Sequence, residues 1–508
     1  MRSFLPAPLV LTIALSAADA PAIRFEAVAA PTAPGAFGAT IAAQPDGNAW
    51  LIWFEPAGSQ STLRVSTFDR ATRQWRAPGT IAGNLNVQPD TSTRPALSVG
   101  ERGDGTVVWI AAAPPTLAAN ATTGPATPHN VQRAFVSQTS DHAQSWTAPA
   151  PLTTASDAVE HVSLAPLADG RVLAAWLDGR GNPAGGDKRA LYSRVIGVPG
   201  SDQLIDDAVS AGCPTALTSF PNGSALVSYR GRTTEDIRDL RVARYHHHRW
   251  ESPHAVHDDG WRTNAAPDHG PHLASDGGRV AVTWFTATQD EPRVLASLSP
   301  DAGSRFLMPL RISETKAAGH VSTVLLHDGA MLVSWVDADG GLWLRRVTPD
   351  FVTTEPLALV ASGRGRIIGR PRLVLLQDYA GGKSVAQLLI GVLRDQEPAL
   401  QTLLVTVPEG DLVEAEKNCD CSGGSDDLQG FALRGRILAA KSPTNTLRVT
   451  HYEVPGMLDE GAREFVLAPD VTLPADVIGR PFLGRFERRS GQWVLFSVRL
   501  IGAAPVEK

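Results

Sequence analysis

One repeated pattern constrains the fold of this chain more than any other feature: a polar turn followed by a β-rich apolar run that often carries tryptophan. The apolar runs of seven such segments begin near residues 49, 106, 172, 225, 280, 331 and 387. The segments are DGNAWLIWFEP, GDGTVVWIAAA, DGRVLAAWLDGR, NGSALVSYRGR, GGRVAVTWFTA, DGAMLVSWVDADG and SVAQLLIGVLRD. A unit that returns roughly every 50 to 60 residues is typical of the four-stranded blade of a β-propeller.

Each apolar run is followed by a second strand-like segment, such as LRVSTF or LRVARY, and most repeats add a short third one beside a proline, as in RAPGTI or ESPHAV. Short strands with turns between them favour a propeller over a solenoid, whose repeats are usually shorter. We therefore predict an all-β chain with a seven-bladed β-propeller over residues 21–408. Six blades is the alternative if the last repeat is an irregular cap.

The last repeat lacks its outer strand, and the segment AIRFEAVAAP near the N-terminus has the pattern of that missing strand. Pairing the two ends of the chain would cover an edge that otherwise exposes unpaired backbone groups. We expect residues 23–28 to pair with the end of the last blade near 388–408.

Two of the polar turns share a tighter pattern that predicts a β-hairpin. Asp301 can accept hydrogen bonds from the backbone that follows it, Gly303 tolerates a positive φ, and Phe306 begins the returning strand. The segment Thr139–Trp146 has the same pattern with Ala143 in the place of the glycine.

Residues 1–20 are typical of a secretory signal peptide, with one early arginine, an apolar run of about ten residues, and small residues near the expected cleavage position. No later apolar run reaches the roughly 18 residues that a membrane-spanning helix needs. We expect a secreted or periplasmic protein with no transmembrane segment after cleavage. The formal net charge of -6 argues against a nucleic-acid partner.

The repeat ends near residue 408, and residues 409–430 are rich in acidic, serine and glycine residues, which indicates a linker. Five strand-like segments follow: FALRGRILAA, TLRVTHYEV, REFVLAP, IGRPFLGRFER and QWVLFSVRLI. Five strands in about 80 residues suit a small closed barrel of the OB type, so we predict such a barrel over residues 431–508.

The hairpin pattern and the propeller period resemble the sialidase-like superfamily, whose hairpins are called Asp-boxes or BNR repeats. The likeness is closer to a group of bacterial secreted sialidase-like proteins, and it rests on AWLDGR, on the long segment Ala211–Leu240 and on DDGW. In that group Cys213 would close a run of three cysteines, whereas Ser210, Ala211 and Gly212 precede it here. One thiol cannot form a thiolate cluster for a soft metal.

The C-terminal segment HYEVPGMLDEGAREF resembles the His-x-x-(Ile/Val)-Pro-Gly segment of a small copper-binding barrel found in periplasmic copper chaperones. The resemblance implies a following Met-x-Met pair as Cu(I) ligands, but Gly461 and Arg463 occupy those positions here. We therefore expect no cofactor and keep copper as the alternative. The residues that could hold a metal are Cys419, Cys421 and His451.

Two charged motifs follow the second strand of neighbouring blades, WLDGR and the charge-dense YRGRTTEDIRD. Loops that end equivalent strands open on the same face of a propeller, so we expect these residues to converge near the axis. The candidate ligand-binding residues are Asp178, Arg180, Tyr229, Arg230, Arg232, Glu235, Arg238 and Asp239. Arginine forks there would suit a carboxylate or a sulfate. The alternative is a salt-bridged loop that fixes the spacing of the blades.

A ligand role for this cluster predicts that Arg230→Ala weakens binding more than it lowers stability. Several histidines are weaker candidates. His246 and His248 could share one face of a strand and bind a metal, but an exposed polar hairpin turn is the favoured interpretation of this segment. Glu160, His161, Asp268, His269 and His272 lie just before or at the start of inner strands, where structural roles are common.

Three functions remain open. The first-ranked function is an exported, non-catalytic propeller that binds a glycan or a protein, with the barrel as a docking module. The second is an exo-acting glycoside hydrolase of the sialidase type, which needs an arginine cluster, a tyrosine nucleophile and acidic partners. Only Tyr192 and Tyr229 lie near predicted blade mouths. The third is a periplasmic copper-handling protein.

Overall fold

The computed structural model describes residues 23–500 apart from 88, 90–93, 113–131, 157, 181–187, 264–268, 327–328, 349–351, 363–366, 378–384, 395–399, 409–429, 442–444, 452–453, 455, 470, 475–476 and 490. The expected signal peptide and nearly all of the expected linker lie outside the described residues. No helix among the described residues has the length and apolar character needed to cross a membrane.

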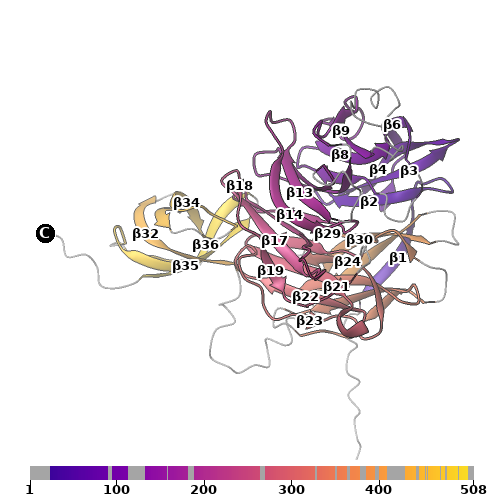
Figure 1. The fold of residues 1–508 in the computed structure, drawn as a ribbon. Coiled ribbons are helices and arrows are strands. Elements are labelled where there is room, and N and C mark those ends of the chain that lie inside the picture. The colour runs from indigo at the N-terminus through magenta and orange to yellow at the C-terminus, as the bar shows by residue number, and fades with distance from the viewer. Residues whose placement is uncertain are drawn as a thin grey trace, which may run out of the picture.

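Seven antiparallel sheets make up the larger part of the molecule (Figure 1). Their first strands contact one another in a closed ring around the axis. These innermost strands are β2 (Phe37–Ala43), β7 (Ala96–Val99), β11 (Val159–Pro166), β15 (Ala216–Ser219), β20 (His272–Asp276), β24 (Ala317–Leu325) and β29 (Leu373–Gln377). The sequence prediction of seven blades is confirmed.

The second and third strands of each sheet lie outside this ring. The second strands are β3 (Ala49–Ala57), β8 (Gly105–Ala112), β12 (Val172–Asp178), β16 (Ala225–Arg230), β21 (Arg279–Thr286), β25 (Met331–Asp337) and β30 (Val385–Arg394). The third strands are β4 (Gln60–Asp69), β9 (Gln132–Thr139), β13 (Lys188–Val195), β17 (Leu240–His246), β22 (Arg293–Ser299), β26 (Leu342–Val347) and β31 (Gln401–Pro408).

The outermost strands are shorter and less regular. They are β5 (Gln74–Trp75) with β6 (Gly79–Leu85), β10 (Ala150–Pro151), β14 (Gln203–Ser210), β18 (Arg249–Trp250) with β19 (His254–His257), β23 (Leu310–Arg311), β27 (Leu357–Val360) and β1 (Arg24–Ala29). In the first and fourth blades two short strands share the outer position, and β28 (Ile367–Ile368) adds to β30 in the last blade.

The apolar runs of the sequence are the second strands, and their burial explains the pattern. Every residue of β12, β16 and β25 is buried. A strand covered on both faces is continuously apolar instead of alternating. The tryptophans Trp50, Trp109, Trp176 and Trp284 on such strands are fully buried and fill the space between blades.

The two ends of the propeller close on each other as expected. Strand β1 pairs with β31 in an antiparallel register from Arg24 opposite Thr406 to Ala29 opposite Gln401. The Thr402 hydroxyl donates to the Val28 carbonyl at 2.7 Å. The last blade therefore obtains its outer strand from the N-terminal end of the described chain.

The two tight turns form as the sequence pattern requires, but the returning strand β23 begins at Leu310 and not at Phe306 as predicted. The Asp141 carboxylate accepts from the Ser145 backbone N–H at 2.9 Å and from the Thr139 hydroxyl at 2.7 Å. The Ser145 hydroxyl also donates to Asp141, at 2.5 Å. This bond above all, together with the others, lowers the pKa of Asp141 to about 2. Gly303 has φ +87, and Ala143 in the equivalent place adopts φ 65.

A five-stranded mixed sheet follows the propeller and lies to one side of it (Figure 1). Its strands are β32 (Phe431–Lys441), β33 (Thr446–His451), β34 (Gly461–Leu467), β35 (Pro481–Arg489) and β36 (Gln492–Leu500). They pair in the cyclic order β32-β33-β34-β36-β35, with β34 and β36 parallel. The five strands expected from the sequence are present.

Candidate functional site

A cavity of about 930 Å³ lies within the ring of innermost strands. It is lined by the first residues of β7, β11, β15 and β20, by the middle of β24, and by the segments that precede β7, β15 and β29. Because equivalent segments from different blades meet there, the cavity collects side chains from distant parts of the sequence.

Three arginines face this cavity: Arg94 before β7, and Arg370 and Arg372 before β29. Arg94 and Arg370 each precede a proline, which favours an extended backbone. Burial, and then repulsion from Arg370 and Arg372, holds the pKa of Arg94 well below its usual value. Burial also lowers the pKa of Arg372. A guanidinium stays charged at neutral pH, so the described lining of the cavity carries three positive charges from arginine.

Three histidines, His161, His272 and His320, also line the cavity. Burial, followed by the charges of Arg372 and Arg94, holds the pKa of His272 well below its usual value, so this imidazole is neutral at pH 7. Its Nδ1 accepts a hydrogen bond from the Thr323 backbone N–H at 3.2 Å. His161 and His320, in the repeated motif His-Val-Ser, both have positive φ and lie at irregularities of β11 and β24.

Glu160 is the one carboxylate among the described residues that line the cavity. It already accepts from Arg189 Nη2 at 2.8 Å and from the Gly212 backbone N–H at 3.1 Å. This carboxylate therefore helps to hold the third blade against the segment that leads into the fourth blade. The remaining arrangement, three guanidinium groups around an open volume, is suited to holding an anion.

The residues predicted from WLDGR form a compact ion-pair group. Asp178, 1% exposed, accepts from Ser156 Oγ at 2.7 Å, and Arg180 Nη2 donates to Asp178 and Asp202 at 2.6 and 2.8 Å. The Arg180 guanidinium lies 4.1 Å from the centre of the Tyr192 ring. Neither Asp178 nor Arg180 lines the cavity.

Arg230 and Arg238 are buried between blades. Arg230, 0% exposed, donates to the Arg238 carbonyl at 2.8 Å and to the Phe285 carbonyl of the next blade, and it lies over the Trp261 ring at 4.8 Å. Arg238 Nη1 donates to Ser210 Oγ of the preceding blade at 2.7 Å. These contacts join three consecutive blades.

The other predicted ligand residues surround this pair. The Tyr229 hydroxyl donates to Asp206 Oδ2 at 2.7 Å, and burial raises the pKa of Tyr229. Arg232 pairs with Asp236 at 2.7 Å. Glu235 is exposed. Asp239 accepts from the backbone N–H groups of Gly260 and Trp261, and burial raises its pKa. None of the eight predicted residues lines the central cavity.

The predicted metal residues are only partly described. Cys419 and Cys421 lie outside the described residues. His451 is buried on β33, directly opposite Gly461 of β34 and 6.2 Å from the Phe465 ring centre. Met457 belongs to the apolar core of the C-terminal sheet. Of the hairpin histidines, His246 and His247 lie together, and His247 and His248 form the exposed turn between β17 and β18. The favoured interpretation of an exposed turn is confirmed, and the alternative that pairs His246 with His248 on one face is wrong.

The sequence interpretation missed the cavity arginines. Their signal was an Arg-Pro step just before the innermost strand of two different blades, at 94–95 and 370–371. The step at 370–371 lies in an arginine-rich run, GRGRIIGRPR, that carries no acidic residue. Charge density along the chain drew attention to 230–239 instead, where the charges neutralise one another.

No family model and no curated protein matches this chain. Solved structures resemble the propeller, among them the BP39L lectin from Burkholderia pseudomallei, with a TM-score of 0.49, 13% identity, and coverage of 73% of this chain and 96% of that chain. A protein of unknown function from Dyadobacter fermentans has a TM-score of 0.45, 12% identity, and coverage of 77% and 100%. The Hadza microbial sialidase Hz136 has a TM-score of 0.39, 11% identity, and coverage of 73% and 65%. Similarity this low assigns no ligand or activity.

Proposed function

We propose that this chain is an exported, non-catalytic binding protein whose central cavity holds an acidic glycan, one that bears carboxylate or sulfate groups. The observation that carries the proposal is the convergence of Arg94, Arg370 and Arg372 on one cavity. Guanidinium forks match the geometry of both anions, and partial burial strengthens the attraction.

The size of the cavity supports a ligand of a few sugar rings. Its volume of about 930 Å³ is at the upper end of the range for small-molecule sites. Apolar side chains such as Val162, Leu164 and Ile110 line it beside the arginines. A sugar ring has both apolar faces and polar edges, so this mixed lining suits it.

The composition of the lining supports binding without catalysis. Glycoside hydrolysis usually needs two carboxylates, and sialidases use a tyrosine nucleophile. The described lining holds one carboxylate, Glu160, and no tyrosine. Tyr229 is bonded to Asp206, and Tyr192 is covered by Arg180. A hydrolase of the sialidase type remains the alternative.

The test is a glycan array probed with the full mature chain. We expect binding to carboxylated or sulfated glycans and not to their neutral counterparts. Arg372→Ala should weaken this binding about 10- to 100-fold, the effect of losing one charged hydrogen-bonding partner. The matched control is Arg305→Ala, which removes an arginine that is 84% exposed on a hairpin turn.

Equal binding of neutral and acidic glycans would contradict the proposal, as would equal losses in the two variants. Cleavage of a fluorogenic sialoside by the wild-type chain, abolished by Arg372→Ala, would favour the hydrolase. Salt supplies a further check, because binding through the arginines should weaken as ionic strength rises.

The finer assignments belong to the same proposal. We propose that the two hairpins are Asp-boxes of the sialidase-like type, that residues 1–20 are a signal peptide directing export, and that the C-terminal sheet is an OB-type barrel resembling that of copper chaperones. The buried contacts of Arg230 and Arg238 support the inter-blade role for the eight predicted ligand residues. Of the eight, Glu235 is exposed, and Arg180, Arg232 and Asp239 are half-buried.

A further inference from the structure

An unusual turn brings two neighbouring histidines together. Strand β17 ends at His246 and β18 begins at Arg249, so His247 and His248 form a two-residue turn with φ of 46° and 63°. Turns of this kind strongly prefer Asn-Gly, because both central residues need a positive φ. Neighbouring side chains of a strand point to opposite faces. Here the left-handed backbone places the His246 and His247 rings side by side, with centres 3.9 Å apart.

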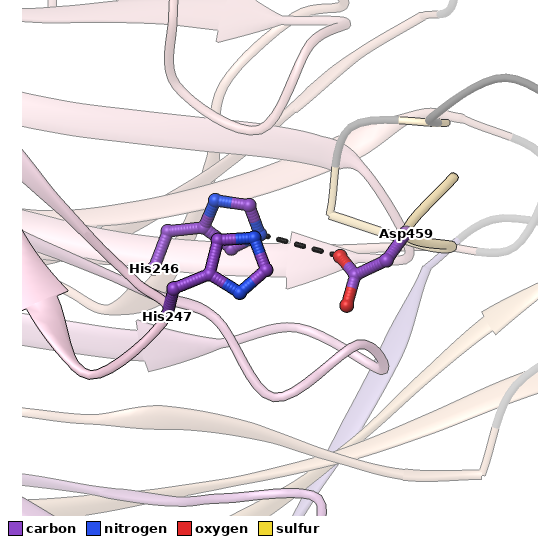
Figure 2. A group of neighbouring side chains, drawn as sticks. All are labelled: His246, His247 and Asp459. Carbon is purple, nitrogen blue, oxygen red and sulfur yellow. Dashed lines mark hydrogen bonds and ion pairs between the residues drawn. The ribbon is translucent and has the colours of Figure 1, made fainter. Parts of the chain in front are cut away.

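A carboxylate from the C-terminal sheet faces this pair. Asp459 Oδ1 lies 3.2 Å from His246 Nε2, and the Asn222 side-chain amide donates to the same oxygen at 3.3 Å. One ligand atom each from His246, His247 and Asp459 all lie within 4.8 Å of one another. Figure 2 shows the two imidazoles and the carboxylate directed toward each other.

The segment that carries Asp459 is held against the propeller by packing. Gly456 abuts Ala302, Gly278 and Phe220, so closely that a Cβ there would lie 2.9 Å from Ala302 Cβ. A Cβ at Gly277 would overlap the Phe431 ring and lie 2.6 Å from Met457 Sδ. Because these contacts flank Asp459, its carboxylate is positioned by the interface and not by the hydrogen bond alone.

We propose that His246, His247 and Asp459 bind a divalent transition metal of the Zn²⁺ class, which clips the C-terminal sheet to the fourth blade. Two imidazoles and one carboxylate are a known protein ligand set for Zn²⁺, with water in the fourth position. Tetrahedral bonds of 2.0–2.1 Å place ligand atoms about 3.3 Å apart. The 3.2 Å between His246 and Asp459 matches that spacing.

The ligand atoms of this site differ from those of the Cu(I) site that the sequence analysis kept as an alternative. Cu(I) prefers thiolate and thioether sulfur, whereas imidazole and carboxylate suit harder divalent ions. Asn222 acts as the outer partner that orients the carboxylate. Because the ligands come from both parts of the molecule, metal binds the docked arrangement only and must stabilise it.

Isothermal titration of the full mature chain with Zn²⁺ tests the site. Cys419→Ser and Cys421→Ser are introduced throughout, so that the linker cysteines contribute no binding. We expect one bound ion per chain. His247→Asn and Asp459→Asn should each weaken binding by at least about tenfold. Asparagine suits the left-handed turn, so His247→Asn removes the imidazole and keeps the hairpin.

His248→Asn is the matched control, because it makes the same change at the other turn residue, whose ring contacts Tyr245 instead. It should bind Zn²⁺ as the parent does. Zn²⁺ should also raise the melting temperature of the parent and of His248→Asn, but not of Asp459→Asn. Equal affinity in all variants overturns the site, as does equal loss in His247→Asn and His248→Asn. A dissociation constant weaker than about 1 mM, the range of casual surface binding, overturns it as well.

Discussion

Two groups of buried or half-buried arginines in this propeller differ in what surrounds them. Arg230 and Arg238 lie between blades, where carbonyl oxygens, a hydroxyl and the Trp261 ring receive their guanidinium groups. Arg94 and Arg372 line the central cavity, where the charges of Arg370 and Arg372 lower the pKa of Arg94 after burial. The first group holds the blades together, and the second raises the electrostatic potential of an open volume.

Burial alone does not distinguish a structural arginine from a candidate ligand-binding one. The two are distinguished by whether protein acceptors surround the guanidinium group. Both groups resist the usual rule that arginine is rarely buried. An inter-blade arginine satisfies protein acceptors, so its removal leaves those acceptors without a donor. A cavity arginine repels neighbouring arginines. Its removal therefore reduces electrostatic repulsion in the folded protein and weakens only the binding of the ligand.

The largest expected effect is on Arg230. Arg230→Ala leaves the Phe285 and Arg238 carbonyls without their donor and opens a void beside Trp261. We expect a loss of roughly 3 to 5 kcal/mol in the free energy of unfolding, measured by urea denaturation. A loss below about 1 kcal/mol is what an exposed charge contributes, and it would contradict the structural role of Arg230 between blades.

The next effect concerns His269, which contacts Phe285, an acceptor of Arg230, and His320, which lines the cavity. Its ring packs 4.4 Å from Phe285 and 5.7 Å from His320, and burial and then the Arg230 charge lower its pKa from 6.5 to about 4. The folded state therefore binds the proton less tightly than the unfolded state. This neutral form stabilises the fold fully above pH 6.5, and the contribution is lost as pH falls toward 4.

We expect this group to lower the wild-type stability by roughly 1 to 2 kcal/mol between pH 7 and pH 5. The free energy of unfolding of His269→Gln should fall less than that of the wild type over the same pH interval, and the difference should be about 1 to 2 kcal/mol. The measurement is the free energy of unfolding at half-unit steps of pH. Parallel curves for the two proteins would show that the folded state does not lower the pKa of His269.

A smaller effect of opposite sign is expected at Arg94. Arg94→Gln removes a guanidinium whose pKa is lowered by burial and by the charges of Arg370 and Arg372. Stability should stay unchanged or rise by up to about 1 kcal/mol, because like charges near one another are unfavourable. Thermal unfolding without ligand checks this, and a clear loss of stability would give Arg94 the structural role of Arg230.

The smallest effect is expected at Arg232, in the middle of the charge-dense segment. Its ion pair with Asp236 is partly exposed to solvent, and such pairs contribute at most about 1 kcal/mol. Arg232→Ala should change the free energy of unfolding by less than about 0.5 kcal/mol and leave glycan binding unaltered. Weaker glycan binding in this variant would restore the charged residues of 230–239 as a ligand site.

Much of the fold follows from local sequence patterns. The starts of the seven second strands lie within two residues of the positions where the apolar runs begin, because a strand buried on both faces needs uninterrupted apolar residues. The pairing of β1 with β31 was also foreseen, since the last repeat lacked one strand. The site followed less well: the mixed charges of 230–239 drew the prediction, whereas the cavity arginines come from two separate segments, at 94 and at 370–372.

The sequence by itself determined the repeat, the number of blades and the closing strand, because strand formation and hairpin turns depend on residues close together in the chain. Only the tertiary structure decided which charges meet. Arg94 and Arg372 come from the second and seventh blades, and His246 meets Asp459 across the boundary between propeller and C-terminal sheet. Contacts between such distant residues depend on how the blades close into a ring and on where the C-terminal sheet packs against them. Coulomb energy depends on distance in space and not along the chain.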